Sequence, residues 1–404
     1  MRRAARYNAD PVRMPLIALL CLTGLGATCT IGAFPALLPE LGTDVRLRDW
    51  ELGVVAAAFG FARMISDVPI GLFIRRRLAA AFIVSPAVMG AGVALLVASH
   101  TFPALVAGRV LMGVGQAVGV VAGLTALLQY YAGRRLGAAL NAFEFSAMIG
   151  LLTGAGLAAA LPADVSWRVV LLLAFAPQII GLVLLPSILR ALRTDVAPMA
   201  AAGVTPPPAR SRDARTLVAL AFVAGALVAI TYTSVEQFII PVRGSREFGL
   251  ERPGLARLLM IIQSADLVAL LPLGLLSDRR GPARVLGGVV LSVAAGAVLV
   301  GFGGVGTMAV GCALFGFGMA GWQIPLSVLR RQTPRELVAW RTALYRVGVD
   351  AGMFLGPFAS GLAGADRLGA VSVVLGALLA AVGAVLLVIG RSDGRCSSSD
   401  GRAP

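Results

Sequence analysis

Charged residues stand inside long apolar stretches of the sequence, where an ionised group is costly unless another group pairs with it. Arg63 and Asp67 lie four residues apart in one stretch, and Arg346 and Asp350 lie four residues apart in another. Residues at this spacing share one face of a helix. The two arginines and two aspartates are therefore candidates for buried ion pairs.

Enzyme chemistry has little support in the sequence. The chain has one histidine and four cysteines, without the paired spacing of a metal site or a disulfide framework. It contains no Gly-x-x-x-x-Gly-Lys-Ser/Thr loop to bind the phosphates of ATP. We therefore expect neither an enzyme nor a resident cofactor or metal.

The composition indicates a protein of the lipid bilayer. Of the 404 residues, 58% are hydrophobic and 14% are charged, whereas a soluble domain carries about 25% charged residues. Apolar runs of about 18 residues or more recur, each long enough for a helix to cross a hydrocarbon core about 30 Å thick. The net charge of +15 comes from arginines in short clusters between these runs. Such scattered clusters do not form the single basic face that nucleic acid needs.

The apolar runs predict an all-α membrane protein with twelve transmembrane helices in two sets of six. The first run is longer than the apolar core of a signal peptide, so it is interpreted as a retained span. The expected spans are residues 15–38, 51–74, 78–98, 102–131, 136–160, 166–189, 215–241, 254–276, 282–302, 306–329, 337–363 and 367–390.

A polar, proline-rich segment separates the two sets and is interpreted as a linker. The expected domains are an N-terminal six-helix bundle (1–189), a cytoplasmic linker (190–214), a C-terminal six-helix bundle (215–390) and a cytoplasmic tail (391–404).

Arginines between the spans predict the orientation. With the N-terminus inside, the clusters at 75–77, 134–135, 190–215, 279–284 and 330–341 all fall on the cytoplasmic side. Fewer arginines then lie outside, as the positive-inside rule requires. We expect both termini in the cytoplasm and a multi-pass protein in the cytoplasmic (inner) membrane.

Matching segments about 203 residues apart indicate an internal repeat. "VPIGLFIRRR" from Val68 matches "LPLGLLSDRR" from Leu271, and "GLLTGAG" from Gly150 matches "GMFLGPF" from Gly352. Both members of each pair fall at the same place in their own half. Because each half has an even number of spans, the two copies should run parallel.

Several motifs of the chain resemble those of the major facilitator superfamily. Gly274-x-x-x-Asp278-Arg279-x-Gly281 is similar to the family's loop motif after the second helix of a half. Arg109 in "AGRVLMGVGQ" is similar to its fourth-helix arginine motif. Gly352-x-x-x-Gly356-Pro357 resembles a Gly-Pro fifth-helix motif associated with exporters, and its N-terminal counterpart is Gly150-x-x-x-Gly154 followed by alanine. The exporter motif is therefore incomplete in the half where it is usual.

The resemblance implies two six-helix bundles that rock about a substrate site near the bilayer midplane. In the family, the acid of the loop motif latches the cytoplasmic side, which suits Asp278 because an acid is favoured at a helix N-terminus. The first copy of the motif has Arg75 at the matching place. We expect another contact to replace the latch there; the alternative is that Arg75 is only one more positive-inside charge.

The family fold packs the second span against the eleventh. Because these spans run in opposite directions, each acid should meet an arginine at its own depth. We predict the crossed pairs Arg63–Asp350 and Asp67–Arg346, which would act as a gate in place of the missing latch or would only brace the bundles.

The symmetric interface joins the fifth span to the eighth, and there the repeat puts Glu144 and Asp266 in place of two arginines. Neighbouring carboxylates in a low dielectric cannot both ionise cheaply, so we expect one of them to hold a proton. Together with Arg109 they are the candidates for proton coupling. The alternative is hydrogen-bonded structural acids, with Arg134 or Arg135 supplying compensation.

The resemblance also indicates which residues line the substrate cavity, since the first, fourth, seventh and tenth spans do so in the family. The candidates there are Gln116, Tyr232, Glu236, Trp322 and Gln323. Glu236 could instead be a charge at the membrane interface, and the two aromatic residues could serve packing alone.

The function expected from these features is secondary active transport of a small molecule, coupled to protons, by a monomer. Export of a drug or metabolite is favoured. The alternatives are a metabolite importer or facilitator and, from another class, a membrane receptor that does not transport.

Overall fold

The computed structural model describes residues 13–131, 133–194, 212–331 and 335–399. The linker expected at 190–214 is described only in part, and residues 400–404 of the expected tail lie outside these ranges. The side chains of Asp278, Arg134 and Arg135 also lie outside the described residues.

The described residues form helices throughout, with no strand among them. In a bilayer, a helix satisfies its own backbone hydrogen bonds, which is why long apolar runs fold this way. In chain order the elements are α1 (Arg13–Val45), α2 (Asp49–Ala98), α3 (Phe102–Tyr130), α4 (Gly133–Ala160), α5 (Trp167–Thr194), α6 (Arg212–Ser234), the π-helical η1 (Val235–Ile239), α7 (Ile240–Arg246), α8 (Arg252–Arg280), α9 (Pro282–Gly301), α10 (Val305–Met319), α11 (Ile324–Arg331), α12 (Arg335–Ala363), the 3₁₀ turn η2 (Ala365–Arg367) and α13 (Leu368–Ser399).

Ten helical stretches of the described chain are long and apolar enough to cross a membrane. One of them is α2, whose 50 residues contain a break at Arg77, where φ is −141° and ψ is 47°. At 1.5 Å per residue such a helix is about 75 Å long, more than twice the thickness of a hydrocarbon core. The break falls between the expected spans 51–74 and 78–98. The count of twelve spans stays a prediction, as does the internal repeat.

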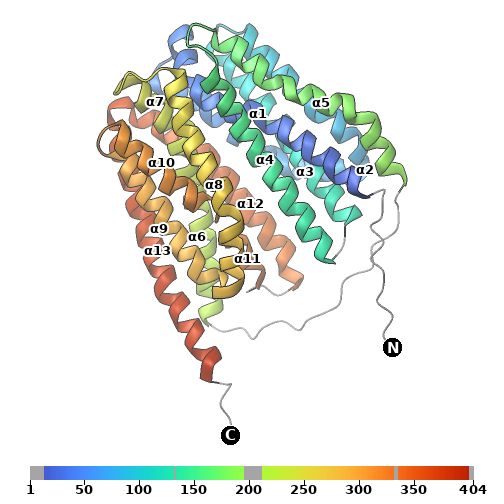
Figure 1. Cartoon of the computed structure of the whole chain (residues 1–404), viewed down its shortest axis with the longest axis vertical. Helices are drawn as coiled ribbons and strands as arrows, with labels where there is room; N and C mark the ends of the chain where they lie inside the picture. Colours follow the sequence, from blue (N-terminus) through green and yellow to red (C-terminus); the bar gives the residue numbers. More distant parts are fainter. Residues whose placement is uncertain (1–12, 132, 195–211, 332–334, 400–404) are drawn as a thin grey trace.

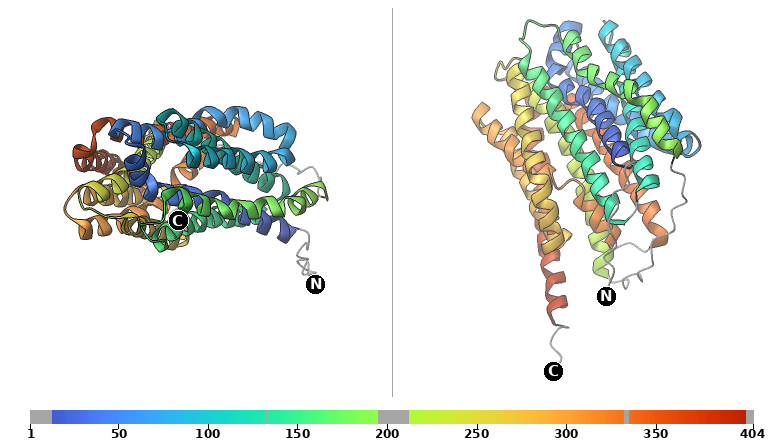
Figure 2. Two further views of the ribbon diagram at one scale, coloured as in Figure 1. Left: turned by 90° about the horizontal axis from the view of Figure 1, so that it is seen from above. Right: turned by 45° about the vertical axis from the view of Figure 1, so that its right-hand side comes forward.

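The helices lie side by side in two groups, α1–α5 and α6–α13 (Figures 1 and 2). The groups touch where α2 packs on α12 and where α4 packs on α8. The turns between α1 and α2 and between α7 and α8 lie at one end, called here the upper end because it is at the top of Figure 1. The other end, where α1 begins and α13 ends, is called the lower end.

Glycines set the closest helix contacts within each group. A Cβ on Gly154 would lie 1.9 Å from the Cys29 carbonyl oxygen of α1, and one on Gly150 would lie 2.3 Å from the Leu25 carbonyl oxygen. In the second group, a Cβ on Gly356 would lie 2.5 Å from the Ile230 carbonyl oxygen of α6. Gly352 makes a looser approach to α6. Small residues at these places let the backbones approach, as is common in membrane helices.

We predict that Gly154→Ala strongly lowers the amount of folded protein, because the added methyl group meets backbone rather than a movable side chain. Overpacking of this kind costs about 1–3 kcal/mol or more. Gly156→Ala is the matched control, since a Cβ there would meet only the tip of Met260 at 3.8 Å. Fluorescence-detected size-exclusion chromatography during heating compares the two. Equal stability of both variants would show that α1 and α4 do not pack as described.

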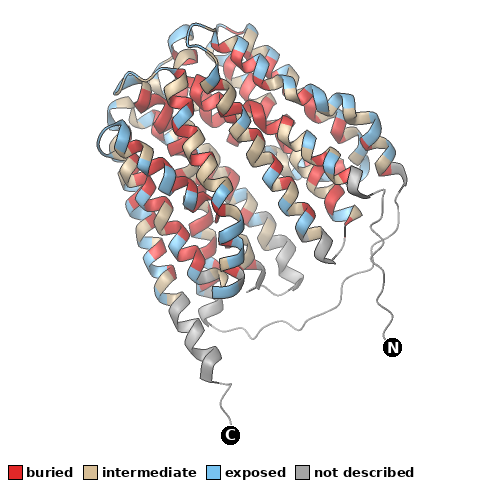
Figure 3. Ribbon diagram, in the orientation of Figure 1, coloured by how far each residue is buried: buried red, intermediate tan, exposed pale blue. Residues whose placement is uncertain are grey.

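Apolar side chains are exposed on the outward faces of the molecule, notably on α5 and α13 (Figure 3). Val183 of α5 is 73% exposed and Val388 of α13 is 69% exposed. A large exposed apolar surface marks contact with lipid or with another protein, and here it surrounds helices of membrane-spanning length.

Two expected spans are not continuous α-helices. The seventh contains the π-helical segment η1, and the tenth is interrupted at residues 320–323, between α10 and α11. A π-helical turn is frequent at functional sites. An interrupted helix at membrane depth is tolerated where it is buried in protein or lines a cavity.

Candidate functional site

Polar side chains from both helix groups meet at one level of the molecule. At 1.5 Å per residue, Arg63, Glu144, Asp266 and Asp350 each lie roughly 20–24 Å below the upper end of their own helix. We call the following residues the central cluster: Arg63 and Asp67 of α2, Gln116 of α3, Glu144 of α4, Tyr232 of α6, Glu236 of η1, Gln263 and Asp266 of α8, Trp322 and Gln323 between α10 and α11, and Arg346 and Asp350 of α12.

Both crossed ion pairs are present in the structure. Arg63 Nε lies 3.1 Å from Asp350 Oδ1, and Arg346 Nε lies 3.4 Å from Asp67 Oδ2. The Asp350 side chain is 2% exposed, so its pair is the more deeply buried of the two. The carboxyl groups of Asp67 and Asp350 also lie close enough for the charge of one to act on the other. The two pairs therefore form one group of four charges across the α2–α12 interface.

The group of four is tied to α3 and α4 as well. Arg63 donates a hydrogen bond from Nη1 to the buried Gln116 side chain. Glu144 of α4 lies beside the side chain of Gln323 from the second helix group, and its nearest arginines are Arg346 and Arg63. The sequence showed no obvious cation for Glu144. The structure corrects this, because the arginines of the crossed pairs lie close enough to act on it.

Carboxyl groups of the second helix group lie next to Glu144. Asp266 of α8 is near enough for its charge to act on that of Glu144. Glu236 is 2% exposed and accepts a hydrogen bond of 3.3 Å from Gln263 Nε2. Its burial corrects the alternative that Glu236 is an interfacial charge: it lies about ten residues, or roughly 15 Å, below the upper end of its span. Tyr232 lies close to both Glu236 and Asp266.

The irregular parts of the seventh and tenth spans face each other across this site. The rings of Tyr232 and Trp322 lie 6.3 Å apart at an interplanar angle of 56°. Trp322 and Gln323 belong to the interruption between α10 and α11, and Glu236 belongs to η1. The break in α10 gives Gln323 its position near Glu144, so the irregular backbone and the polar side chains form one site.

Arg109 stands apart from the central cluster. Its guanidinium carbon lies 3.7 Å from the centre of the Phe34 ring and 5.0 Å from that of Phe59, and Nε donates to the Val55 carbonyl oxygen at 3.4 Å. It is 2% exposed and packs between α1, α2 and α3, only about 10 Å below the upper end. The structure therefore does not bring Arg109 together with Glu144 and Asp266. Stacking on aromatic rings replaces the acid that a buried arginine usually needs.

The acid of the expected latch, Asp278, has a side chain outside the described residues, so only the glycines and arginine of the motif can be placed. Nothing lies within 4 Å of a Cβ built on Gly274, so no helix approaches through this small residue. Arg279 is exposed, and Gly281, with φ of 84°, makes the turn between α8 and α9. Gly71, close to the break in α2, and Gly348, at the level of the central cluster in α12, likewise meet no neighbour.

The upper end is closed by contacts between the two groups. Arg252 at the start of α8 has a fully buried side chain, and its Nη1 lies 2.8 Å from Glu40 Oε2 of α1. The same guanidinium donates to the carbonyl oxygens of Pro162 and Val165 in the turn between α4 and α5. One arginine of the second group thus holds two elements of the first.

Asp49 at the start of α2 makes a second closing contact. Its Oδ1 pairs with Arg246 of α7, and its Oδ2 accepts a hydrogen bond of 2.9 Å from the Ala365 backbone N–H. Just below, a Cβ on Gly53 would lie 2.7 Å from the Gly361 Cα of α12. We call Glu40, Asp49, Arg246, Arg252 and Ala365 the upper closure.

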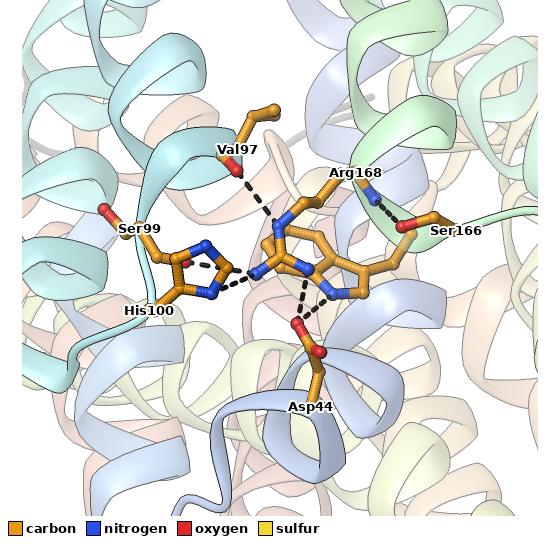
Figure 4. A network of polar contacts seen from close by, with 7 residues as sticks. Asp44, Val97, Ser99, His100, Ser166 and Arg168 are labelled. Carbon is orange, nitrogen blue, oxygen red and sulfur yellow. Dashed lines mark hydrogen bonds and ion pairs between the residues drawn. The ribbon is translucent and has the colours of Figure 1, made fainter.

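Arg168 braces the first helix group at the same end (Figure 4). It pairs with Asp44 of α1 at 2.5 Å and donates to the carbonyl oxygens of Val97 and Ser99 near the end of α2. Trp167 Nε1 donates to the same Asp44 carboxylate at 3.0 Å. In the second group Arg243 binds Glu247 in the loop after α7, and this hydrogen bonding lowers the pKa of Glu247.

Comparison with known proteins decides the family. A model of the family described as Major Facilitator Superfamily matches residues 16–265, more than half of the chain. The chain belongs to the major facilitator superfamily. It is therefore a multi-pass membrane protein of a family of transporters and not an enzyme.

Individual relatives of this superfamily member have low sequence identity to it. Myo-inositol transporter 2 from Cryptococcus neoformans var. grubii is 27% identical over 192 residues, which are 44% of this chain and 33% of that transporter. The match thus spans about a third of the relative's length. A solved POT family transporter has a TM-score of 0.77 at 13% identity, with 93% of this chain and 96% of that chain covered. The nucleoside transporter NupG has a TM-score of 0.71 at 11% identity, with 93% and 98% covered. These structures show the shared fold.

Sequence reasoning missed the upper closure, Gln263 as the partner of Glu236, and the contact between Asp67 and Asp350. Arginines at the upper loops looked like ordinary loop charges. The one available signal was that Arg252 and Arg246 lie beside acids in a region where positive charge is disfavoured.

Proposed function

We propose that the chain is a secondary active transporter of the cytoplasmic membrane that couples its substrate to protons by alternating access, with export favoured. The observation that carries this proposal is the central cluster, which joins carboxyl groups and ion pairs of both helix groups at one depth. An ionisable group at this depth is costly and marks a substrate or proton pathway by default.

The two ends of the molecule support alternating access. The upper closure ties the groups together, whereas Gly71 and Gly274, which lie below the central cluster, meet no neighbour. With both termini in the cytoplasm, the contacts of the upper closure shut the external side of the transporter, and the cytoplasmic side is the open one. The crossed pairs lie between the two ends. There they act as a gate between the two helix groups as the groups rock.

Proton coupling is assigned to Glu144 and Asp266. We expect Glu144→Gln and Asp266→Asn to abolish the response of transport to a pH gradient, because neither amide can release a proton. Downhill exchange of substrate should survive. The measurement is flux of a compound panel in proteoliposomes with the gradient imposed or collapsed. Asp366→Asn, at an exposed acid in η2, is the matched control and should behave as the wild type. Flux of the wild type that ignores the gradient would refute the coupling.

Facilitated transport of a neutral polyol is the second candidate, favoured by the similarity to a myo-inositol transporter. Myo-inositol therefore belongs in the panel. Saturable myo-inositol flux that is equal with and without the gradient would favour this candidate over proton-coupled export.

A further inference from the structure

We propose that the central cluster binds a protonated amine, and that the substrate is an organic cation with N–H donors and an apolar or aromatic body. This inference rests on the proposed transport function and gives the substrate class of the same site.

Charge at the cluster is unbalanced towards acids. Arg63 and Arg346 are matched by Asp350 and Asp67. Glu144, Asp266 and Glu236 have no ion pair among the residues that the structure describes. Arg109, a proton-coupling candidate in the sequence, is packed on Phe34 and Phe59 and stays out of the site. A ligand that enters this region meets three carboxyl groups that form no ion pair with a described residue, although the arginines of the crossed pairs act on Glu144 from a distance.

The hydrogen-bonding groups left over are acceptors. Gln263 is 4% exposed, and its Oε1 is buried without a partner while its Nε2 binds Glu236. Because the amide is held by Glu236, this oxygen stays within the cluster. Asp266 has no hydrogen bond among the described residues. A buried acceptor without a donor costs about 1–3 kcal/mol, so the site favours a ligand that donates. An ammonium group supplies both donors and the missing charge.

The same site has an aromatic wall. Tyr232 and Trp322 lie 6.3 Å apart, next to the irregular segments of their spans. Aromatic faces attract cations and pack against apolar groups. A cation with an aromatic or aliphatic body thus finds a partner for each of its parts.

The surroundings of the carboxyl groups favour exchange of a bound amine for a proton. The ionisable groups that face them are Tyr232 from α6, Cys312 from α10, and Arg63 and Arg346 from the crossed pairs. Without a ligand, protons on the carboxyl groups keep the interior near neutrality. When R–NH₃⁺ binds, a carboxyl group loses its proton to water and becomes the counter-ion. One positive charge enters and one leaves, which is the stoichiometry of an exchanger.

The test uses three probes of one shape: 3-phenylpropylamine, 3-phenylpropanol and 3-phenylpropanoate, which are a cation, a neutral molecule and an anion at neutral pH. Isothermal titration of the full chain in detergent should show the amine binding at least about tenfold more tightly than the alcohol, and no binding of the carboxylate. Titrations in buffers of different ionisation enthalpy should show about one proton released for each amine bound.

Variants identify the groups involved. Glu236→Gln and Asp266→Asn should each weaken amine binding about tenfold and leave alcohol binding unchanged, which shows that the variants are folded. Asp366→Asn should leave amine affinity unchanged. Equal affinity for amine and alcohol in the wild type, or amine affinity that survives both cluster variants, would overturn the proposal.

Binding in detergent separates this inference from the proposed function. Amine binding without gradient-driven flux in proteoliposomes would refute the function and keep the site. Gradient-driven flux of another compound, without amine binding, would refute the substrate class and keep the function.

Discussion

We expect Arg63→Asp to abolish transport, and adding Asp350→Arg to the same chain to restore part of it. The single variant removes the cation that lies 3.1 Å from Asp350 and sets a second acid against it. Losing one partner of a buried pair costs about 3–5 kcal/mol, which is a large part of the stability of most proteins. The double variant restores opposite charges at the same depth. Rescue should be partial, because Arg63 also donates to Gln116.

Transport and membrane abundance are measured together for this series. Rescue of both would identify a gate, whereas rescue of abundance alone would identify a brace. The same experiment can be done on the second ion pair, with Asp67→Arg and Arg346→Asp made singly and together. Double variants no better than the worse single variant would show that the pairs contribute nothing as pairs.

We expect a disulfide across the upper closure to stop transport until the bond is reduced. Asp49 Oδ2 lies 2.9 Å from the Ala365 backbone nitrogen, so the start of α2 and the η2 turn are neighbours, and Asp49→Cys with Ala365→Cys is the pair chosen to link them. The bond would hold the closure shut, and alternating access requires it to open. The background lacks the native cysteines Cys21, Cys29, Cys312 and Cys396.

The controls are the two single variants under the same oxidant, which should transport as they do when reduced. Flux in the double variant should fall to the level of empty liposomes on oxidation and return with reductant. Transport that continues through the oxidised double variant, with the bond verified by mass spectrometry, would show that the closure does not move.

The helical character of the chain and the crossed pairs were predictable from the sequence, because both depend on local spacing. Apolar runs set the helices, and the i,i+4 spacing of Arg63 with Asp67 put both charges on one face. The packing of α2 against α12, taken from the family resemblance, then decided which residues meet. The glycines of α4 and α12 were recognised for the same reason, since a close helix approach needs a small residue at fixed intervals.

The surroundings of single charges were not predictable. Arg109 has the residue type of a cavity group, but the rings of Phe34 and Phe59 come from two other helices and could not be placed from sequence. Only the alternative interpretation of Glu236 failed, because a span end was mistaken for a membrane interface. Arg252 lies beside an acid in the sequence, but its burial arises only when the turn between α4 and α5 folds over it.

Distances across the upper end test the central claim, that the two helix groups alternate about the central cluster. Spin labels at Ala163→Cys and Asp366→Cys, exposed positions in the two groups, can be measured by double electron–electron resonance in nanodiscs across a pH series. The account predicts two distance populations, the shorter with the closure formed, and a ratio that changes with pH in the wild type but not with Glu144→Gln and Asp266→Asn combined. A single distance at every pH, in protein shown to transport, would contradict it.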